Sequence, residues 1–442
     1  MSGSFTSLTW PVEETVPECI VNVMPNLTEV HTYGVSWRDR GEKINPPIID
    51  AGWTYFAPNL RHLGLTIHAS RLSTAIPHSI QFPNLETLYI KILMDGIYVS
   101  TVADSSLQAL ASFINELHSH LQKLVIRSSS RLDVSTLLLS LGKFEHLTFL
   151  ELDNTAASLR GGLPDVDPSI QFMNKNTATI RDLTLAAPSL TSSLNFQYLC
   201  LQNLTTLLLD SSFLSSSYFF WNKTLAVFFK NVSHTLKSLI ILGSLDPARL
   251  GWLISAIEAG DLGPANGLRK LSIGVARLTR DIVVSISKNL HRLDSLTLRV
   301  HEVDGPGTYF VIPGDKFPVR MILPYHPLDI FYLPLSQDSA EESFAVQLRE
   351  VSFDQWKLRD ITIKRSSCCG EFFLWGLMKL FAKCIPSLKS FAGNGDMVVP
   401  DPPNEKRAGG TTSCTDMVCS YGKAGTRTSR EFPLRNSLLY RP

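Results

Sequence analysis

The chain has 442 residues, with 41 Lys or Arg against 40 Asp or Glu and a formal net charge of +1. This balance argues against a dedicated nucleic-acid binder and a polybasic membrane protein, because both depend on an excess of positive charge. With 44% hydrophobic and 18% charged residues, the chain has ample material for a core, which excludes disorder over its whole length.

The N-terminal residues and the cysteines indicate an intracellular protein, cytoplasmic or nuclear. Residues 1–20 lack the basic start, apolar run and small-residue cleavage site of a secretory signal, and we expect them to be a short leader. The seven cysteines are odd in number and scattered, unlike those of a disulfide scaffold. No stretch approaches the roughly eighteen consecutive apolar residues of a membrane span.

Leucine is concentrated between Leu60 and Leu298, where it fills 48 of 239 positions. One phrase, L-x-x-L-x-L or a close variant, occurs ten times at spacings of 24 to 36 residues. The ten phrases begin at Leu27, Leu60, Leu85, Leu121, Leu147, Ile180, Leu204, Leu236, Leu268 and Leu293. Because the second and third apolar positions lie two residues apart, each phrase predicts a short strand with both side chains on one face.

The segments between the phrases predict helices. After the third phrase, apolar residues recur at helical spacing, at Leu107, Leu110, Ala111, Ile114 and Leu117. Pro247 and Thr279 are typical of the first turns of two further helices. Strand and helix alternating every thirty residues or so predict a right-handed α/β solenoid over residues 21–300, with a parallel sheet on the concave face and helices on the convex face.

Three phrases are preceded by Pro-Asn, in Met24-Pro-Asn-Leu27, Ala57-Pro-Asn-Leu60 and Phe82-Pro-Asn-Leu85. With these features the chain resembles leucine-rich repeat proteins of the ribonuclease-inhibitor subtype, and more narrowly the fungal F-box/leucine-rich-repeat proteins. The resemblance covers about residues 20–300, with a weaker continuation to about 395. It implies a substrate receptor of a ubiquitin ligase, which binds a ligase adaptor through its F-box. Trp10-Pro-Val-Glu-Glu14 is the nearest match to an F-box and no apolar helix follows it, so adaptor binding does not carry over residue by residue.

Beyond Val300 the repeat pattern breaks. Residues 301–345 contain six prolines and predict an insertion loop. Phrases at Leu348 and Leu358 begin too close together for two parallel repeats, so one of them predicts a hairpin or a capping unit. A helix over 371–384 and a strand at 388–391 complete the C-terminal repeats and cap, residues 346–395. Residues 396–442, rich in Gly, Pro, Ser and Thr, predict a disordered tail.

No motif for catalysis, cofactors or metals is present in the sequence. It lacks G-x-S-x-G, the Walker-type G-x-x-x-x-G-K and H-E-x-x-H. Cys368, Cys369 and Cys384 lack the paired spacing of a metal finger. We therefore predict no enzymatic activity and no cofactor or metal. Two alternatives stay open: a truncated gene copy without maintained function, or an enzyme whose site in the insertion uses Asp304, Asp315, His326 or Asp329.

In each phrase the third, fifth and seventh residues point away from the buried leucines, onto the concave face. The first strands are aromatic and basic there, the middle strands are acidic, and an apolar patch at Ile240 and Leu242 follows. Mixed polar residues occur on any exposed sheet face, but tyrosines beside arginines are typical of protein-binding surfaces. We predict a protein ligand, and neither nucleic acid nor a membrane, at nine concave residues: Tyr89, Lys91, Arg127, Phe149, Glu151, Asp153, Asp182, Asp210 and Arg299.

Overall fold

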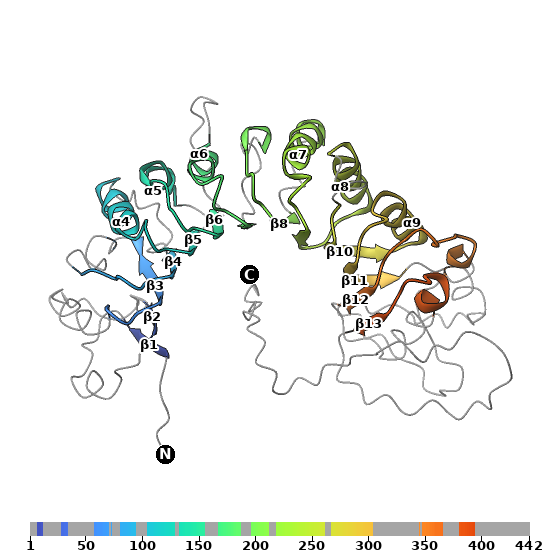
Figure 1. Cartoon of the computed structure of the whole chain (residues 1–442), viewed down its shortest axis with the longest axis horizontal. Helices are drawn as coiled ribbons and strands as arrows, with labels where there is room; N and C mark the ends of the chain where they lie inside the picture. The colour runs from blue at the N-terminus through green and yellow to red at the C-terminus, as the bar shows by residue number, and fades with distance from the viewer. Residues whose placement is uncertain are drawn as a thin grey trace, which may run out of the picture.

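A computed structural model gives the fold of the protein as an arc of strands with helices along its outer side (Figure 1). It describes residues 7–11, 28–33, 57–69, 72, 80–93, 104–128, 132–154, 167–186, 196–211, 218–260, 267–303, 344, 347–365 and 380–393. The described residues form an α/β solenoid, as the repeat of the sequence predicts. The predicted tail lies wholly outside the described residues, as does the predicted insertion apart from 301–303 and 344.

Within these described ranges, thirteen strands form one sheet in which sequence order and spatial order coincide and every neighbouring pair is parallel. The strands are β1 Ser7–Pro11, β2 Glu29–Tyr33, β3 His62–His68, β4 Thr87–Leu93, β5 Lys123–Ser128, β6 Phe149–Asn154, β7 Asp182–Leu185, β8 Thr206–Asp210, β9 Ser238–Leu242, β10 Lys270–Leu278, β11 Ser295–Val303, β12 Asp360–Arg365 and β13 Ser390–Gly393. The ten phrases form β2 to β11, which confirms that each is one strand of the array.

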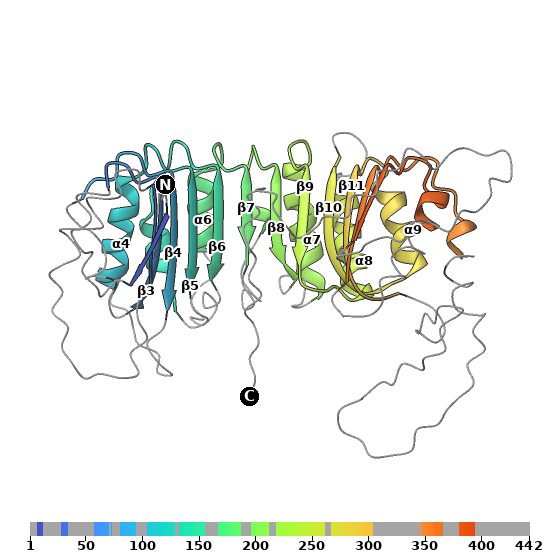
Figure 2. The same cartoon turned by 90° about the horizontal axis from the view of Figure 1, so that it is seen from below.

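The helices lie on the convex side of the sheet (Figures 1 and 2). They are α4 Asp104–Glu116, α5 Ser135–Ser140, α6 Pro168–Lys175, the short 3-10 helix η2 Phe196–Tyr198, α7 Tyr218–Val232, α8 Pro247–Ala259 and α9 Arg280–Asn289. The predicted helix starts are confirmed. Thr279 Oγ1 accepts a hydrogen bond from Ile282 N at 3.3 Å, and Pro247 occupies the first turn of α8.

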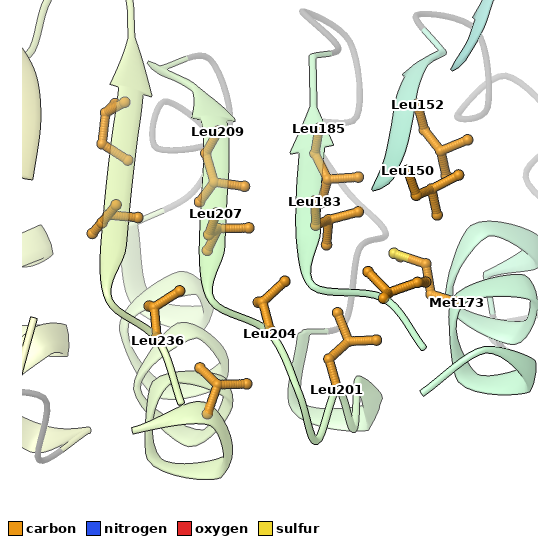
Figure 3. Packing of buried hydrophobic residues seen from close by; sticks show 14 of the residues in the cluster. Leu150, Leu152, Met173, Leu183, Leu185, Leu201, Leu204, Leu207, Leu209 and Leu236 are labelled. Carbon is orange, nitrogen blue, oxygen red and sulfur yellow. The ribbon is translucent and has the colours of Figure 1, made fainter. Parts of the chain in front are cut away.

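The core lies between the sheet and the helices. Figure 3 shows the leucines of neighbouring strands stacked in rows, with Leu183 and Leu185 beside Leu207 and Leu209. These four side chains are at most 1% exposed. Burying one such side chain contributes about 1.5–3 kcal/mol. Since each row continues into the next repeat, the core of one repeat is completed only by its neighbours.

A regular set of hydrogen bonds joins each repeat to the next. Arg61 O accepts from both Glu86 N and Thr87 N at 2.9 Å, and the same two-to-one pattern recurs along the sheet as far as Lys389 and Ser390 on Arg359 O. The asparagine of Phe82-Pro-Asn-Leu85 adds a side-chain bond, from Asn84 Nδ2 to Pro58 O at 2.6 Å. These bonds satisfy backbone groups at the turns that enter the strands.

The ends of the array differ from the sequence prediction in two places. Residues 7–11, inside the predicted leader, form β1 and pair with β2. Of the two closely spaced C-terminal phrases, the one at Leu358 forms β12, whereas residues 347–349 are helical. The two phrases therefore form a single parallel repeat, which confirms that they are too close together for two, and the hairpin alternative is wrong. The predicted last strand is confirmed as β13, and 380–384, the described part of the helix predicted before it, is helical.

Candidate functional site on the concave face

The nine predicted binding residues all lie on the sheet face opposite to the buried leucines. Lys91 is exposed and the other eight are half-buried. Eight of them are brought together on five consecutive strands, β4 to β8, whereas Arg299 is on β11. Parallel register aligns Lys91, Arg127 and Asp153 in one row across β4, β5 and β6, and places Tyr89 and Glu151 in the row beside it.

Arg127 connects side chains of the strands on both sides of it. Its Nε and Nη2 donate to Glu151 Oε1 at 2.7 and 2.6 Å, and its Nη1 donates to Tyr89 Oη at 3.4 Å. The guanidinium carbon also lies 5.3 Å from the centroid of the Tyr89 ring. The Glu151 side chain is only 13% exposed, so this ion pair is better shielded from water than a surface pair. The result is a fixed group of one cation, one anion and one aromatic ring.

The protonation of this group follows from its burial and charges. Burial lowers the pKa of Arg127, but Glu151, Tyr89 and Asp153 together outweigh this effect, and the pKa of Arg127 lies above its ordinary value. Burial raises the pKa of the Tyr89 hydroxyl, and the Arg127 charge offsets only part of this increase. Arg127 is therefore charged and Tyr89 neutral at physiological pH, which suits a hydrogen-bonding surface.

Among the described carboxylates, Asp153 has the pKa most strongly shifted by its surroundings. Burial, together with the negative charges of Glu151 and Asp210, raises its pKa from 3.8 to about 6, although Arg127 and Lys91 oppose the shift. Among the described residues, its side chain forms neither a hydrogen bond nor an ion pair. Asp153 therefore changes its charge close to physiological pH and is poised to respond to an added cation.

Lys123 belongs to the same surface, although it is not among the nine predicted residues. Its Nζ lies 4.2 Å from the centroid of the Phe149 ring, and parallel register pairs the two residues across β5 and β6. Burial lowers the pKa of the Lys123 ammonium group, and Glu151 offsets part of this effect. The sequence contains a signal for this contact, because Lys123 and Phe149 both occupy the third position of successive phrases.

Strands β7 to β9 carry acidic and apolar side chains. Asp182 on β7 is half-buried and, within the described part of the chain, has no ion-pair partner. Leu208 is paired with Ile240, and Asp210 with Leu242, across β8 and β9. These two pairs are half-buried, although they lie on the face away from the core. The centre of the concave face therefore combines negative charge with apolar area.

Arg299 is engaged in a different way. Its Nη2 donates to Ile241 O on β9, two strands away. The paired register between β9 and β10 ends at Ile240 and Ser272. After β9 the chain turns at Gly243, which has a φ of 80°, and the backbone of Gly243 lies against Gly274. A Cβ atom on Gly274 would lie 2.0 Å from Gly243 O. Arg299 thus makes an internal contact where the ladder is interrupted, and the structure does not bring it to the other eight residues.

Neither a metal-binding cluster nor a membrane-spanning helix is found in the described part of the chain. None of its His, Cys, Asp and Glu side chains gather in groups of three or more suited to a metal ion. Among the helices of the same ranges, none is long and apolar enough to span a bilayer.

Comparisons with known proteins give a likeness to solved structures alone. No family model matches it, and no curated protein matches it. One similar solved structure is the crystal structure of the Rad7 and Elc1 complex in yeast, with 13% sequence identity and a TM-score of 0.31. That likeness covers 65% of this chain and 81% of the other. The solenoid assignment therefore depends on the parallel sheet and repeats of the protein itself.

Proposed function

We propose that this protein is a non-catalytic scaffold that binds a protein ligand on its concave face. The observation that carries the proposal is the continuous surface on β4 to β9. There the Arg127–Glu151–Tyr89 group is followed, on β6 to β9, by acidic and apolar side chains at concave positions of the register. The helices lie on the other side of the sheet (Figure 1). Arginine and tyrosine are among the residues most enriched at the positions that dominate binding energy in protein interfaces.

The backbone supports this role physically. The concave side chains of β4 to β8 are displayed from strands that are paired on both sides, at steps of about 4.8 Å. Little backbone entropy remains to be lost when a ligand binds, which is the advantage of a preorganised surface. The basic and aromatic strands β4 and β5 suit an acidic segment, and the acidic and apolar strands β6 to β9 suit a basic one. A surface with both signs orients its ligand and disfavours wrong partners.

In its finer form, the proposal makes the protein a substrate-receptor module similar to those of F-box/leucine-rich-repeat proteins. A second partner would then be a ubiquitin-ligase adaptor, bound outside the concave face. Support for this form comes from the resemblance of the repeats and the Pro-Asn-Leu segments. Recovery of an adaptor together with the concave-face ligand would support it further.

A charge swap tests the binding face. In the double variant Lys91→Glu/Asp182→Lys the net charge is unchanged, but the charge pattern of the concave face is reversed at β4 and β7. Proximity labelling in cells should show proteins that the wild type recovers and this variant loses by about tenfold or more.

The matched control carries the same swap on the convex helices, Glu258→Lys/Lys288→Glu, where Glu258 is exposed and Lys288 lies at the end of α9. It should recover the same proteins as the wild type. Equal recovery by the wild type and both variants, with all three folded by circular dichroism, would contradict a concave-face ligand.

A further inference from the structure

The centre of the concave face has a composition that calls for a particular ligand. We define the acidic–apolar patch as Asp153, Asp182, Leu208, Asp210, Ile240 and Leu242, all half-buried on β6 to β9. Burial is the main cause of the raised pKa of Asp153, and the negative charges of Glu151 and of Asp210, two strands away, add to it. Added cations would relieve this repulsion, and added apolar side chains would cover Leu208 and Ile240. The patch therefore fits a segment that is both basic and apolar.

The chain itself contains such a segment. Residues 420–442 carry five Lys or Arg and a single acidic residue, Glu431. Large apolar side chains stand between the charges, at Phe432, Leu434, Leu438, Leu439 and Tyr440. This stretch therefore combines an excess of positive charge with large apolar side chains. Its charge is opposite to that of the acidic–apolar patch, and its apolar side chains match those of the patch.

The chain between β13 and this segment is long enough to bring the two together. β13 is five strands from β8 and seven from β6 in the sheet, which corresponds to about 24–34 Å at ~4.8 Å per strand. Residues 394–419 form a connection of 26 residues. A chain of that length can span up to about 90 Å, which exceeds the distance to the patch.

We propose that residues 420–442 bind the acidic–apolar patch within the same chain and compete there with an external protein ligand. The inference rests on the proposed function in one respect, since both place a binding surface on the concave face. A segment tethered this way has an effective concentration on the order of 1 mM, so even a weak contact is substantially occupied. An external ligand must then displace it, which makes binding selective for partners with a stronger basic segment.

Photo-crosslinking of the full chain tests this inference. With the photoreactive residue benzoylphenylalanine at position 432, irradiation should link the segment to peptides of β6 to β9. The double variant Asp153→Lys/Asp182→Lys should lower the yield by about fivefold or more, because two attractive charges become repulsive. In the matched control Glu258→Lys/Asp281→Lys, the net charge changes equally on convex helices, and the yield should stay within about twofold.

A second variant tests the contact without altering the sheet. Arg427→Glu/Arg430→Glu/Arg435→Glu lies wholly in the segment and should lower the yield in the same way. Links between unlike copies in a mixture of heavy- and light-isotope protein would assign the contact to a second copy and overturn the proposal. Links elsewhere, no links, or a yield insensitive to both charge reversals would overturn it as well. Loss of external ligands in the Lys91→Glu/Asp182→Lys variant is measured by proximity labelling and not by crosslinking. The proposed protein ligand and the proposed contact of residues 420–442 can therefore fail independently.

Discussion

Strands β5 and β11 each carry an arginine at the seventh position of their repeat, Arg127 and Arg299, and the two arginines make different contacts. Arg127 pairs with side chains of the adjacent strands, Glu151 and Tyr89. Arg299 instead donates to a backbone carbonyl, that of Ile241, two strands away. Burial lowers the pKa of Arg299. At Arg127 the charge of Glu151 counteracts the effect of burial, whereas no carboxylate of the described residues does so at Arg299.

The difference comes from the backbone beneath each arginine. Around Arg127 the ladder runs unbroken through the row of Lys91, Arg127 and Asp153, so its guanidinium meets side chains. Near Arg299 the pairing of β9 and β10 has ended and the chain crosses Gly274, which places a carbonyl within reach. The side chains at equivalent repeat positions thus contact one another across strands only where the sheet under them is regular.

The largest effect is expected from Gly274→Ala, which disrupts the interrupted region directly. The new Cβ would meet Gly243 O at 2.0 Å, and a backbone atom cannot move aside as a side chain can. We expect a loss of about 3 kcal/mol in the free energy of unfolding, measured by urea denaturation.

Gly64→Ala is the matched control in a regular part of the sheet. There the added Cβ meets the His31 ring at 2.1 Å, and this partly exposed side chain can turn away. The cost should stay below about 1 kcal/mol. If both glycine variants lost the same free energy, the crossing at Gly274 would not be a special constraint.

A smaller effect is expected from Arg299→Met, which keeps much of the side-chain volume but removes the donor to Ile241 O. An acceptor that loses its partner in a partly buried site costs about 1–2 kcal/mol. Lys364→Met provides the control, because Lys364 is exposed and is paired with Arg299 in register on β12. Urea denaturation should show it within about 0.5 kcal/mol of the wild type. Equal losses of unfolding free energy in the two variants would contradict a structural role for Arg299.

The smallest effect concerns Asp153 and pH. Its pKa is about 6 in the fold against an ordinary value of 3.8, so between these values the folded state binds more protons than the unfolded state. By linkage, the unfolding free energy falls as pH rises through about 6 and recovers as pH is lowered. Between pH 7.5 and pH 5 the wild type should gain about 1 kcal/mol over Asp153→Asn, after allowance for partial exposure. Parallel pH profiles for the two proteins would contradict the raised pKa.

Much of the fold is predictable from the sequence because the relevant information is local. Leucines two residues apart select one face of a strand, and a leucine such as Leu207 becomes buried wherever the phrase occurs. Thr279 marks a helix start through a hydrogen bond made within one turn. Pro247 marks another because its ring fixes φ and its missing N–H needs no partner in the first turn. β1 was not predictable in this way, since residues 7–11 lack the phrase and become a strand by pairing with β2.

The sequence by itself determined the repeat, the ten strands β2 to β11 and the face on which their side chains lie, because period and capping act over a few residues. Only the tertiary structure decided which concave side chains meet. The contact of Arg127 with Glu151 depends on register between repeats, and the contact of Arg299 with Ile241 depends on the path of the chain across Gly274. Both contacts join residues tens of positions apart, so periodicity within one repeat carries no information about them.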